Sequence, residues 1–375
     1  MRIGILTLPL VNNYGGYLQA WALQQTLTRL GHEAILLNRR RNDEHRPVVP
    51  QKGIKDYAKN ALRPMWHILK RLLGRMPQRY MKEYDWFMAH DINPKTDKLY
   101  STEELNHAVM NLRLDAIVVG SDQVWRRWTH DPNFITLKDF FLSFLDDHSM
   151  VKRVAYAASF GVDKWELNDE ETKDHAVLAK RFVGISVRED SGVRLCNEYL
   201  HVKAQHVLDP TMLMDVDDYQ KLIAERKTTS YANTLSSYIL DSSDEIKSVL
   251  QSLSVEKKLP WRDLFKDYVV PPSFAQWLRA FSDATMIVTD SFHGTVFSIL
   301  FNKPFVVLGN ELRGQARFVS LLKIFGLEDR LVSIHEPSRI KDVISEPVDW
   351  ERVNRIRQQW REKSMDFLNR SLSLK

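Results

Sequence analysis

The first forty residues combine two apolar runs with one helical pattern. Residues 2–8 form a short, mainly apolar run that predicts a strand. From Tyr17 onwards, apolar residues recur at three- and four-residue spacing, which is typical of an amphipathic helix, and Gly31 is expected to end it. A second apolar run at 33–37 predicts another strand. Strand, helix and strand together form a βαβ unit, which belongs to a parallel sheet.

Further apolar runs follow in the same order along the chain. The runs at 114–119, 153–158 and 182–187 each end in a small or polar turn before helix-like sequence, as buried parallel strands do. After them we expect a strand at 238–240, a helix near 273–281, a strand at 285–288, a helix at 293–301, a strand at 305–308 and a terminal helix at 349–371. The pattern predicts an α/β protein with doubly wound sheets, divided near residues 200–212.

Length and composition agree with this architecture. A chain of 375 residues exceeds the usual size of one hydrophobic core, which favours two domains. No apolar run reaches the roughly 18 residues of a membrane-spanning helix, and the first residues predict a strand rather than a signal peptide. Cys196 is the only cysteine, so the sequence excludes an intrachain disulfide and a cysteine-rich metal site, and it favours the reducing cytoplasm.

The net charge of +5 is unevenly distributed. Residues 46–82 contain ten Lys or Arg and one acidic residue, Asp56. Their apolar positions fall near one helical face, with Pro64 as an expected break. Such a basic helical segment either lies on an anionic membrane or packs its apolar face on its own domain, and the second is the simpler interpretation. No nucleic-acid-binding motif occurs, so no nucleic-acid partner is expected.

The loop after the first strand contains two asparagines followed by two glycines. Asn13, Gly15 and Gly16 can present backbone N–H groups to an anion. The alternative is a tight turn that needs glycine for a positive φ. The loop does not match the glycine pattern of a dinucleotide site, so no such cofactor is assigned.

A second polar turn, at residues 290–295, joins the strand at 285–288 to the next helix. It contains Asp290, Ser291, His293, Gly294 and Thr295. A histidine at a strand end and a helix start is placed for anion binding or proton transfer. The alternative is a buried structural histidine, with Asp290 capping the helix.

Five motifs occur in order, and together they resemble the polysaccharide pyruvyl transferase family. They are Asn13-Tyr14-Gly15-Gly16-Tyr17-Leu18-Gln19-Ala20, Gly120-Ser121-Asp122-Gln123-Val124-Trp125, Ser186-Val187-Arg188-Glu189, Leu208-Asp209-Pro210-Thr211 and Thr289-Asp290-Ser291-Phe292-His293-Gly294-Thr295. The likeness runs from residue 1 to about 330. The basic segment at 46–82 and the stretch 241–270, which looks short for a full second half, do not match clearly.

The resemblance implies two Rossmann-like domains that face each other across a cleft, as in GT-B glycosyltransferases. We therefore expect an N-terminal domain at 1–204 on the acceptor side, with the basic helical insert 46–82. A C-terminal domain at 205–345 would lie on the donor side, followed by a C-terminal helix at 346–375.

The activity implied is transfer of the enolpyruvyl carbons of phosphoenolpyruvate to two hydroxyls of a sugar, giving a pyruvate ketal. It needs neither a metal nor an organic cofactor. The acceptor in the family is often a lipid-linked saccharide, which favours peripheral contact of the basic helix with the inner face of the membrane.

Roles follow for the polar residues. His293 is the candidate acid or phosphate partner, and Asp290 would orient it. Arg188 is the candidate ligand for phosphate or carboxylate, with a salt bridge to Glu189 or Asp190 as the alternative. Asp122 is the candidate base for an acceptor hydroxyl, or else the cap of the following helix. The remaining candidates for substrate binding are Asn13, Gly15, Gly16, Gln19, Ser121, Ser291, Gly294, Thr295, Arg313 and Arg317. For Arg313 and Arg317, which are second-choice phosphate ligands, exposed surface charge is the simpler interpretation.

One position departs from the family pattern. Many members have an arginine two residues before the histidine, where this chain has Ser291. Either another arginine, such as Arg188, Arg313 or Arg317, binds the donor, or the donor geometry differs. Two further hypotheses share the fold: a GT-B glycosyltransferase that uses a nucleotide sugar, and a non-catalytic scaffold that binds carbohydrate or membrane.

Overall fold

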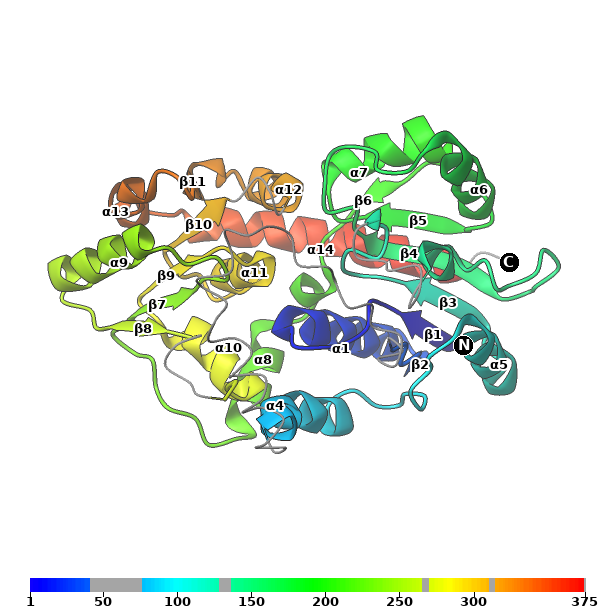
Figure 1. Cartoon of the computed structure of the whole chain (residues 1–375), viewed down its shortest axis with the longest axis horizontal. Helices are drawn as coiled ribbons and strands as arrows, with labels where there is room; N and C mark the ends of the chain where they lie inside the picture. The colour runs from blue at the N-terminus through cyan, green and yellow to red at the C-terminus, as the bar shows by residue number, and fades with distance from the viewer. Residues whose placement is uncertain (41–75, 128–135, 265–269, 310–313, 374–375) are drawn as a thin grey trace, which may run out of the picture.

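The computed structural model describes residues 1–40, 76–127, 136–264, 270–309 and 314–373. The chain forms two separate parallel sheets, each with helices on both faces (Figure 1). This arrangement confirms the expected α/β fold with two Rossmann-like halves.

The N-terminal sheet has six parallel strands in the order β2-β1-β3-β4-β5-β6. They are β1 (Arg2–Leu6), β2 (Glu33–Leu36), β3 (Ala116–Val119), β4 (Lys152–Ala158), β5 (Gly184–Val187) and β6 (Gln205–His206). The strand order reverses between β1 and β3, and ligands of open α/β sheets bind beyond the carboxyl ends of the strands near such a point.

Alternate side chains of these strands enter two different cores. Ile3 and Ile5 of β1 pack in the core that contains α1 (Tyr14–Arg29). Leu6 enters the opposite core, with α5 (Thr102–Leu112) and α6 (Asp169–Ala179). Because side chains alternate along a strand, both faces of the sheet are buried, which explains the continuous apolar runs in the sequence.

The C-terminal sheet has five parallel strands in the order β11-β10-β9-β7-β8. They are β7 (Leu235–Tyr238), β8 (Trp261–Asp263), β9 (Met286–Thr289), β10 (Phe305–Gly309) and β11 (Leu331–Ser333). One face is covered by α9 (Asp244–Lys257) and α13 (Ile340–Ser345), and the other by α10 (Phe274–Asp283) and α11 (Phe292–Leu300).

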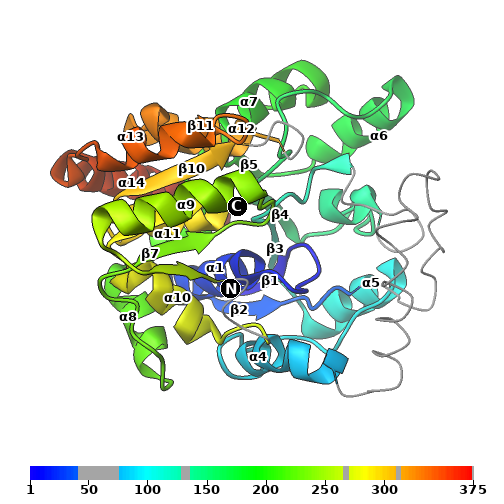
Figure 2. The same ribbon diagram turned by 60° about the vertical axis from the view of Figure 1, so that its left-hand side comes forward.

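One core joins the two sheets. It contains side chains of α1, α8 (Val216–Ala224), α10 and α11, and α10 lies beside α1 in both views (Figure 2). Within this core Tyr14 stacks on Trp277 with ring centroids 5.3 Å apart, and the Tyr14 hydroxyl donates to the carbonyl of Pro272 at 2.6 Å. The first turn of α1 is therefore anchored on the C-terminal half.

The terminal helix also connects the halves. α14 (Trp350–Ser373) contacts β4 and β5 of the first sheet and α12 (Ala316–Phe325) beside the second, and it runs along both in Figure 1. The helix expected at 349–371 is thus confirmed. In the described part of the chain, no helix combines the length and apolar character that a membrane span requires.

The structure corrects several expected boundaries. α1 begins at Tyr14 rather than Tyr17, so Gly15 and Gly16 are helical and the alternative of a tight turn with positive φ is wrong. The strand expected at 238–240 lies earlier, at Leu235–Tyr238. The stretch that looked short for a full second half contains α9 and β8.

The basic segment is described only at its end. Residues 76–82 belong to α4 (Met76–His90), and residues 46–75 lie outside the described part of the chain. The last strand of the first sheet ends at His206 and the first strand of the second begins at Leu235.

Candidate active site

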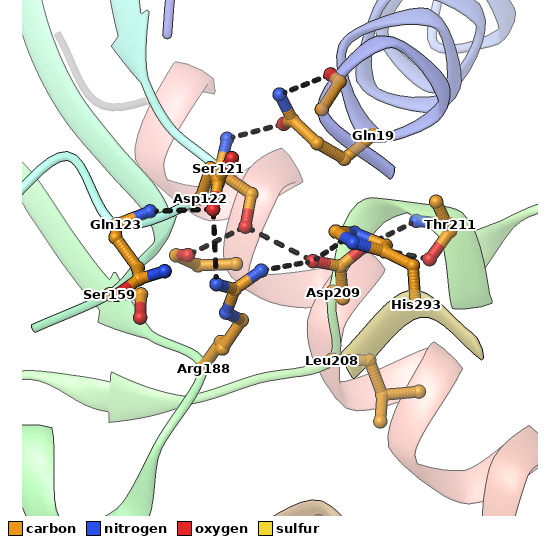
Figure 3. Close-up of polar contacts among 12 residues, drawn as sticks. Gln19, Ser121, Asp122, Gln123, Ser159, Arg188, Leu208, Asp209, Thr211 and His293 are labelled. Atoms are coloured by element: carbon orange, nitrogen blue, oxygen red, sulfur yellow. Dashed lines mark hydrogen bonds and ion pairs between the residues drawn. The ribbon is translucent and has the colours of Figure 1, made fainter. Parts of the chain in front are cut away.

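Four polar side chains converge beyond the carboxyl ends of the strands. Asp122 follows β3, Arg188 follows β5, Asp209 follows β6, and His293 lies in the first turn of α11 after β9. Figure 3 shows these side chains and their contacts. Three come from the N-terminal sheet and one from the C-terminal half, so the candidate site lies where the two halves meet.

Asp209 is the centre of this group. The side chain is buried, and its carboxylate accepts hydrogen bonds from Arg188 Nη1 at 2.8 Å and Ser121 Oγ at 3.3 Å (Figure 3). It also accepts from the backbone N–H of Thr211 at 3.0 Å and from its hydroxyl at 2.7 Å. His293 Nε2 lies 3.7 Å from Asp209 Oδ2.

These neighbours determine the charge of Asp209. Burial by itself raises the pKa of a carboxyl group, but His293, Arg188 and Thr211 together outweigh it, and the pKa of Asp209 lies below its ordinary value. Asp209 is therefore an anion at neutral pH.

Arg188 bridges two carboxylates. It donates to Asp209, and its Nη2 lies 3.4 Å from Asp122 Oδ1. Its guanidinium carbon lies 4.4 Å from the centre of the Phe292 ring, within the range of a cation–π contact. Burial lowers the pKa of Arg188, but the neighbouring carboxylates raise it further, so it stays protonated.

The expected alternative for Arg188, a salt bridge to Glu189 or Asp190, is wrong. Asp190 pairs with Lys323 at 3.0 Å. Glu189 is fully buried and accepts a hydrogen bond from the backbone N–H of Gly161 at 2.8 Å. Burial raises the pKa of Glu189 more than Arg188 and its other neighbours lower it. The ion pairs of Arg188 are made across the rim, to Asp122 and Asp209.

Buried side chains fix the loop that carries Asp122. The Gln19 side chain accepts a hydrogen bond from the backbone N–H of Ser121 at 2.9 Å, and both residues are fully buried. Asp122 has a φ of 71° and accepts from the backbone N–H of Gln123 at 2.9 Å. No α-helix occurs in the described residues 123–127, so Asp122 is not a helix cap there. The hydrogen bond between Gln19 and Ser121 therefore fixes the start of this loop.

The first turn of α11 is capped by serine. The Ser291 side chain accepts from the backbone N–H of Gly294 at 3.3 Å, and Thr295 Oγ1 donates to the Ser291 carbonyl at 3.1 Å. The Asp290 carboxylate accepts from the amides of residues 240 and 241 at 2.7 and 2.8 Å. Capping by Asp290 is therefore wrong, and its expected role in orienting His293 stays a prediction.

His293 lies against the first turn of α1. A Cβ atom built on Gly15 would fall 1.9 Å from His293 Nδ1, so backbone and ring are in close contact. His293 Nε2 is buried and has no hydrogen-bond partner among the described residues. Asn13 is exposed at the N-cap of α1, and its side chain makes no capping hydrogen bond.

Arg317, on α12, reaches the same aromatic ring as Arg188. Its guanidinium carbon lies 5.7 Å from the centre of the Phe292 ring. Its Nε is buried without a hydrogen-bond partner in the described structure. Burial first, and then the charge of Arg188, lower the pKa of Arg317 to about 10, so it is a cation at neutral pH. Arg313 lies outside the described residues.

Two contributors, Asp209 and Phe292, were not predicted as site residues. Both stand within motifs that carry the family resemblance, but Asp209 follows a strand of only two residues, Gln205–His206. Such a strand has too little periodicity to mark a rim position. No three His, Cys, Asp or Glu side chains in the described ranges are grouped to hold a metal ion.

Comparisons with solved structures agree with this fold. UDP-GlcNAc 2-epimerase from Neisseria meningitidis, solved with UDP-GlcNAc, superposes with a TM-score of 0.52 at 8% identity, covering 99% of this chain and 100% of that one. The glycotransferase of kitacinnamycin gives a TM-score of 0.45 at 13% identity, covering 99% and 98%. MurG from Acinetobacter baumannii gives 0.44 at 8% identity, covering 96% and 94%. At such identities the first of these shows a shared GT-B-like fold and nothing about the reaction.

Sequence comparison identifies the family. No curated protein matches the chain. The family model described as polysaccharide pyruvyl transferase matches residues 13–311, a span that includes the candidate residues from Asn13 to Thr295 but ends before Arg313 and Arg317. Since this match covers well over half of the chain, the protein belongs to the polysaccharide pyruvyl transferase family.

Proposed function

We propose that the protein transfers the enolpyruvyl group of phosphoenolpyruvate to two hydroxyls of a saccharide, producing a pyruvate ketal and inorganic phosphate. The observation that carries this proposal is a set of three nitrogens at one junction. Arg188 Nε, Arg317 Nε and His293 Nε2 are buried, and none has a hydrogen-bond partner within the described residues. Buried polar groups without partners are rare, and three together at a strand-end rim favour an anionic ligand.

The donor's chemistry fits these groups. Phosphoenolpyruvate carries a phosphate and a carboxylate on adjacent carbons. Both arginines approach Phe292: Arg317 is suited to bidentate contact with the phosphate, and Arg188, whose terminal nitrogens pair with Asp209 and Asp122, offers its Nε. The first turns of α1 and α11 meet at Gly15 and His293 and offer backbone N–H groups to the carboxylate. In this assignment Arg317 supplies the positive charge that many family members carry as an arginine at the position of Ser291.

The reaction needs a proton donor and a proton acceptor. An acceptor hydroxyl adds to C2 while His293 donates a proton to C3, which turns the methylene carbon into a methyl group. Asp122 takes the hydroxyl proton, which returns to His293 through solvent. The bond from C2 to the phosphate oxygen then breaks, and the second hydroxyl forms its bond to C2. Its proton leaves with the phosphate, so one hydroxyl hydrogen ends in the methyl group and the other in hydrogen phosphate.

The acceptor is proposed to be a sugar of a polysaccharide or of its lipid-linked precursor, bound on the side of the N-terminal sheet where Asp122 lies. A lipid-linked acceptor would bring the protein to the inner face of the membrane. The basic residues between 46 and 82 would then favour an anionic surface.

Calorimetry tests the donor. The protein is titrated with phosphoenolpyruvate, inorganic phosphate, UDP and GDP, and we expect heat with phosphoenolpyruvate and none with either nucleotide. Binding of UDP or GDP without phosphoenolpyruvate would instead identify a nucleotide-sugar glycosyltransferase. No binding at all would indicate a non-catalytic scaffold. Incubation with phosphoenolpyruvate and a panel of lipid-linked saccharides should then release phosphate and increase the mass of one acceptor.

A further inference from the structure

We propose that Gly15 is a positioning residue for His293. Because Gly15 lacks a side chain, the backbone of the first turn of α1 lies directly against the imidazole ring and forms a wall that holds it. The inference rests on the proposed function only in taking His293 as the acid. It gives Gly15 a role distinct from the anion contact expected from the sequence.

The close contact involves one edge of the ring rather than one atom. A Cβ atom at Gly15 would lie 1.9 Å from Nδ1, 2.3 Å from Cγ and 2.7 Å from Cε1 of His293. On the other side of the ring, Nε2 lies 3.7 Å from Asp209 Oδ2. The imidazole therefore sits between a backbone wall and a carboxylate, both from the N-terminal half, although His293 itself belongs to the C-terminal half.

The wall is fixed because α1 is anchored at both ends of its first turn. The Tyr14 hydroxyl donates to Pro272 at 2.6 Å, and the Tyr14 ring stacks on Trp277. One turn further, the Gln19 side chain donates to the carbonyl of Gly16 at 2.8 Å and accepts from Ser121. These contacts hold α1 in place, so we expect a side chain at position 15 to displace the His293 ring and not α1 as a whole.

α11, which carries His293, is held equally firmly. A Cβ atom at Gly294 would lie 2.3 Å from Thr289 Oγ1, so the helix start is pressed against the end of β9. The Ser291 cap closes the same turn. With both backbones fixed, rotation of the His293 ring is the response that remains open. We therefore expect Gly15→Ala to keep the fold and move the ring.

Gly16 provides the matched control for the structural effect. A Cβ atom there would lie 3.3 Å from Asn13 Nδ2, and the Asn13 side chain is exposed and can move. Both substitutions replace glycine by alanine in the same helical turn. Each should stabilise the helix by about 0.5–1 kcal/mol before any clash is counted. A difference between the two variants therefore reports the contact with His293.

NMR of the full-length protein tests the contact without any substrate. The imidazole signals of His293 are assigned by their loss in His293→Ala. Gly15→Ala should shift these signals while Gly16→Ala leaves them in place, with thermal unfolding showing that both variants are folded. Unchanged His293 signals in a folded Gly15→Ala protein would overturn the proposal. This comparison decides the role of Gly15 even if phosphoenolpyruvate proves not to be the donor.

Turnover measurements then test how displacement of the His293 ring affects catalysis. Gly15→Ala should lower kcat about 10²-fold, the scale expected when a reacting group is misplaced by about 1 Å, with a smaller change in KM for phosphoenolpyruvate. In the His293→Ala background the same substitution should have little further effect, because its effect is transmitted through the missing ring. Equal losses in both backgrounds would show that Gly15 acts independently of His293, and would overturn the proposal.

Discussion

The two halves of the molecule contribute different kinds of group to the candidate site. The N-terminal half supplies a connected charge network, in which Arg188 pairs with Asp122 and Asp209. The C-terminal half supplies Arg317 and His293, neither of which forms a hydrogen bond through its buried nitrogen in the described structure. The N-terminal rim is internally paired except at Arg188 Nε, and the C-terminal rim offers Arg317 and His293 to a ligand.

This difference separates stability from ligand binding. Charges in a buried network depend on one another, since removing one partner leaves the other without compensation. A buried cation without an ion pair costs free energy in the folded protein and gains a partner only when an anion binds. The N-terminal network therefore organises the rim, while Arg317, His293 and the unpartnered Nε of Arg188 are the groups that we expect the donor to contact.

The largest expected effect is on the free energy of unfolding, and it should differ between Arg188 and Arg317. Arg188→Met leaves Asp122 and Asp209 without their common cation, so we expect the free energy of unfolding at neutral pH to fall by about 3–5 kcal/mol. Arg317→Met breaks no ion pair seen in the described residues, and its change should stay within about 1 kcal/mol. Chemical denaturation of both variants measures the difference. Equal losses would contradict the proposed division between the two rims.

The next effect concerns catalysis and not stability. His293→Ala should retain the fold and lower turnover by about 10²-fold or more, the usual contribution of a general acid. Phosphate release from phosphoenolpyruvate in the presence of acceptor measures turnover, and circular dichroism verifies the fold. A variant with the wild-type rate would exclude His293 from the mechanism and leave Arg188 and Arg317 as anion ligands only.

The sequence predicted most of the fold because both sheets are parallel and buried on both faces. Their strands appear as continuous apolar runs, and polar residues directly after a run mark the rim. Asp122, Arg188 and His293 were recognised in this way, and the structure brings all three together. The apolar runs could not predict which side chains each rim residue contacts, because those contacts depend on how the two halves pack.

Three features show this limit. Asp209 follows a two-residue strand, and Arg317 reaches Phe292 from another helix. Neither the rim position of Asp209 nor the contact of Arg317 with Phe292 has a local signal in the sequence. The start of α1 was placed late because Gly15 and Gly16 suggest a turn, whereas here they are helical and let His293 approach the helix. Ser291 stands where many family members have an arginine, but only the folded chain shows that Arg317 lies near this position.

The smallest effect concerns His206, where the N-terminal network meets α12. His206 Nε2 lies 3.1 Å from the carbonyl oxygen of Arg188 and 3.2 Å from Ser320 Oγ. Burial lowers the pKa of His206 to about 4, despite the opposing contribution of the Arg188 carbonyl. The folded state thus binds this proton less readily than the unfolded chain, in which the pKa of histidine is about 6.5.

Stability from a neutral His206 is present above about pH 6.5 and is lost as the pH falls towards about 4, by at most about 1.4 kcal/mol per pH unit for one proton. Urea denaturation across this range should show a shallower loss in His206→Gln than in the wild type. Parallel curves would mean that His206 titrates alike in both states. In that case the link from the Arg188 carbonyl through His206 to Ser320 of α12 would not depend on a neutral imidazole.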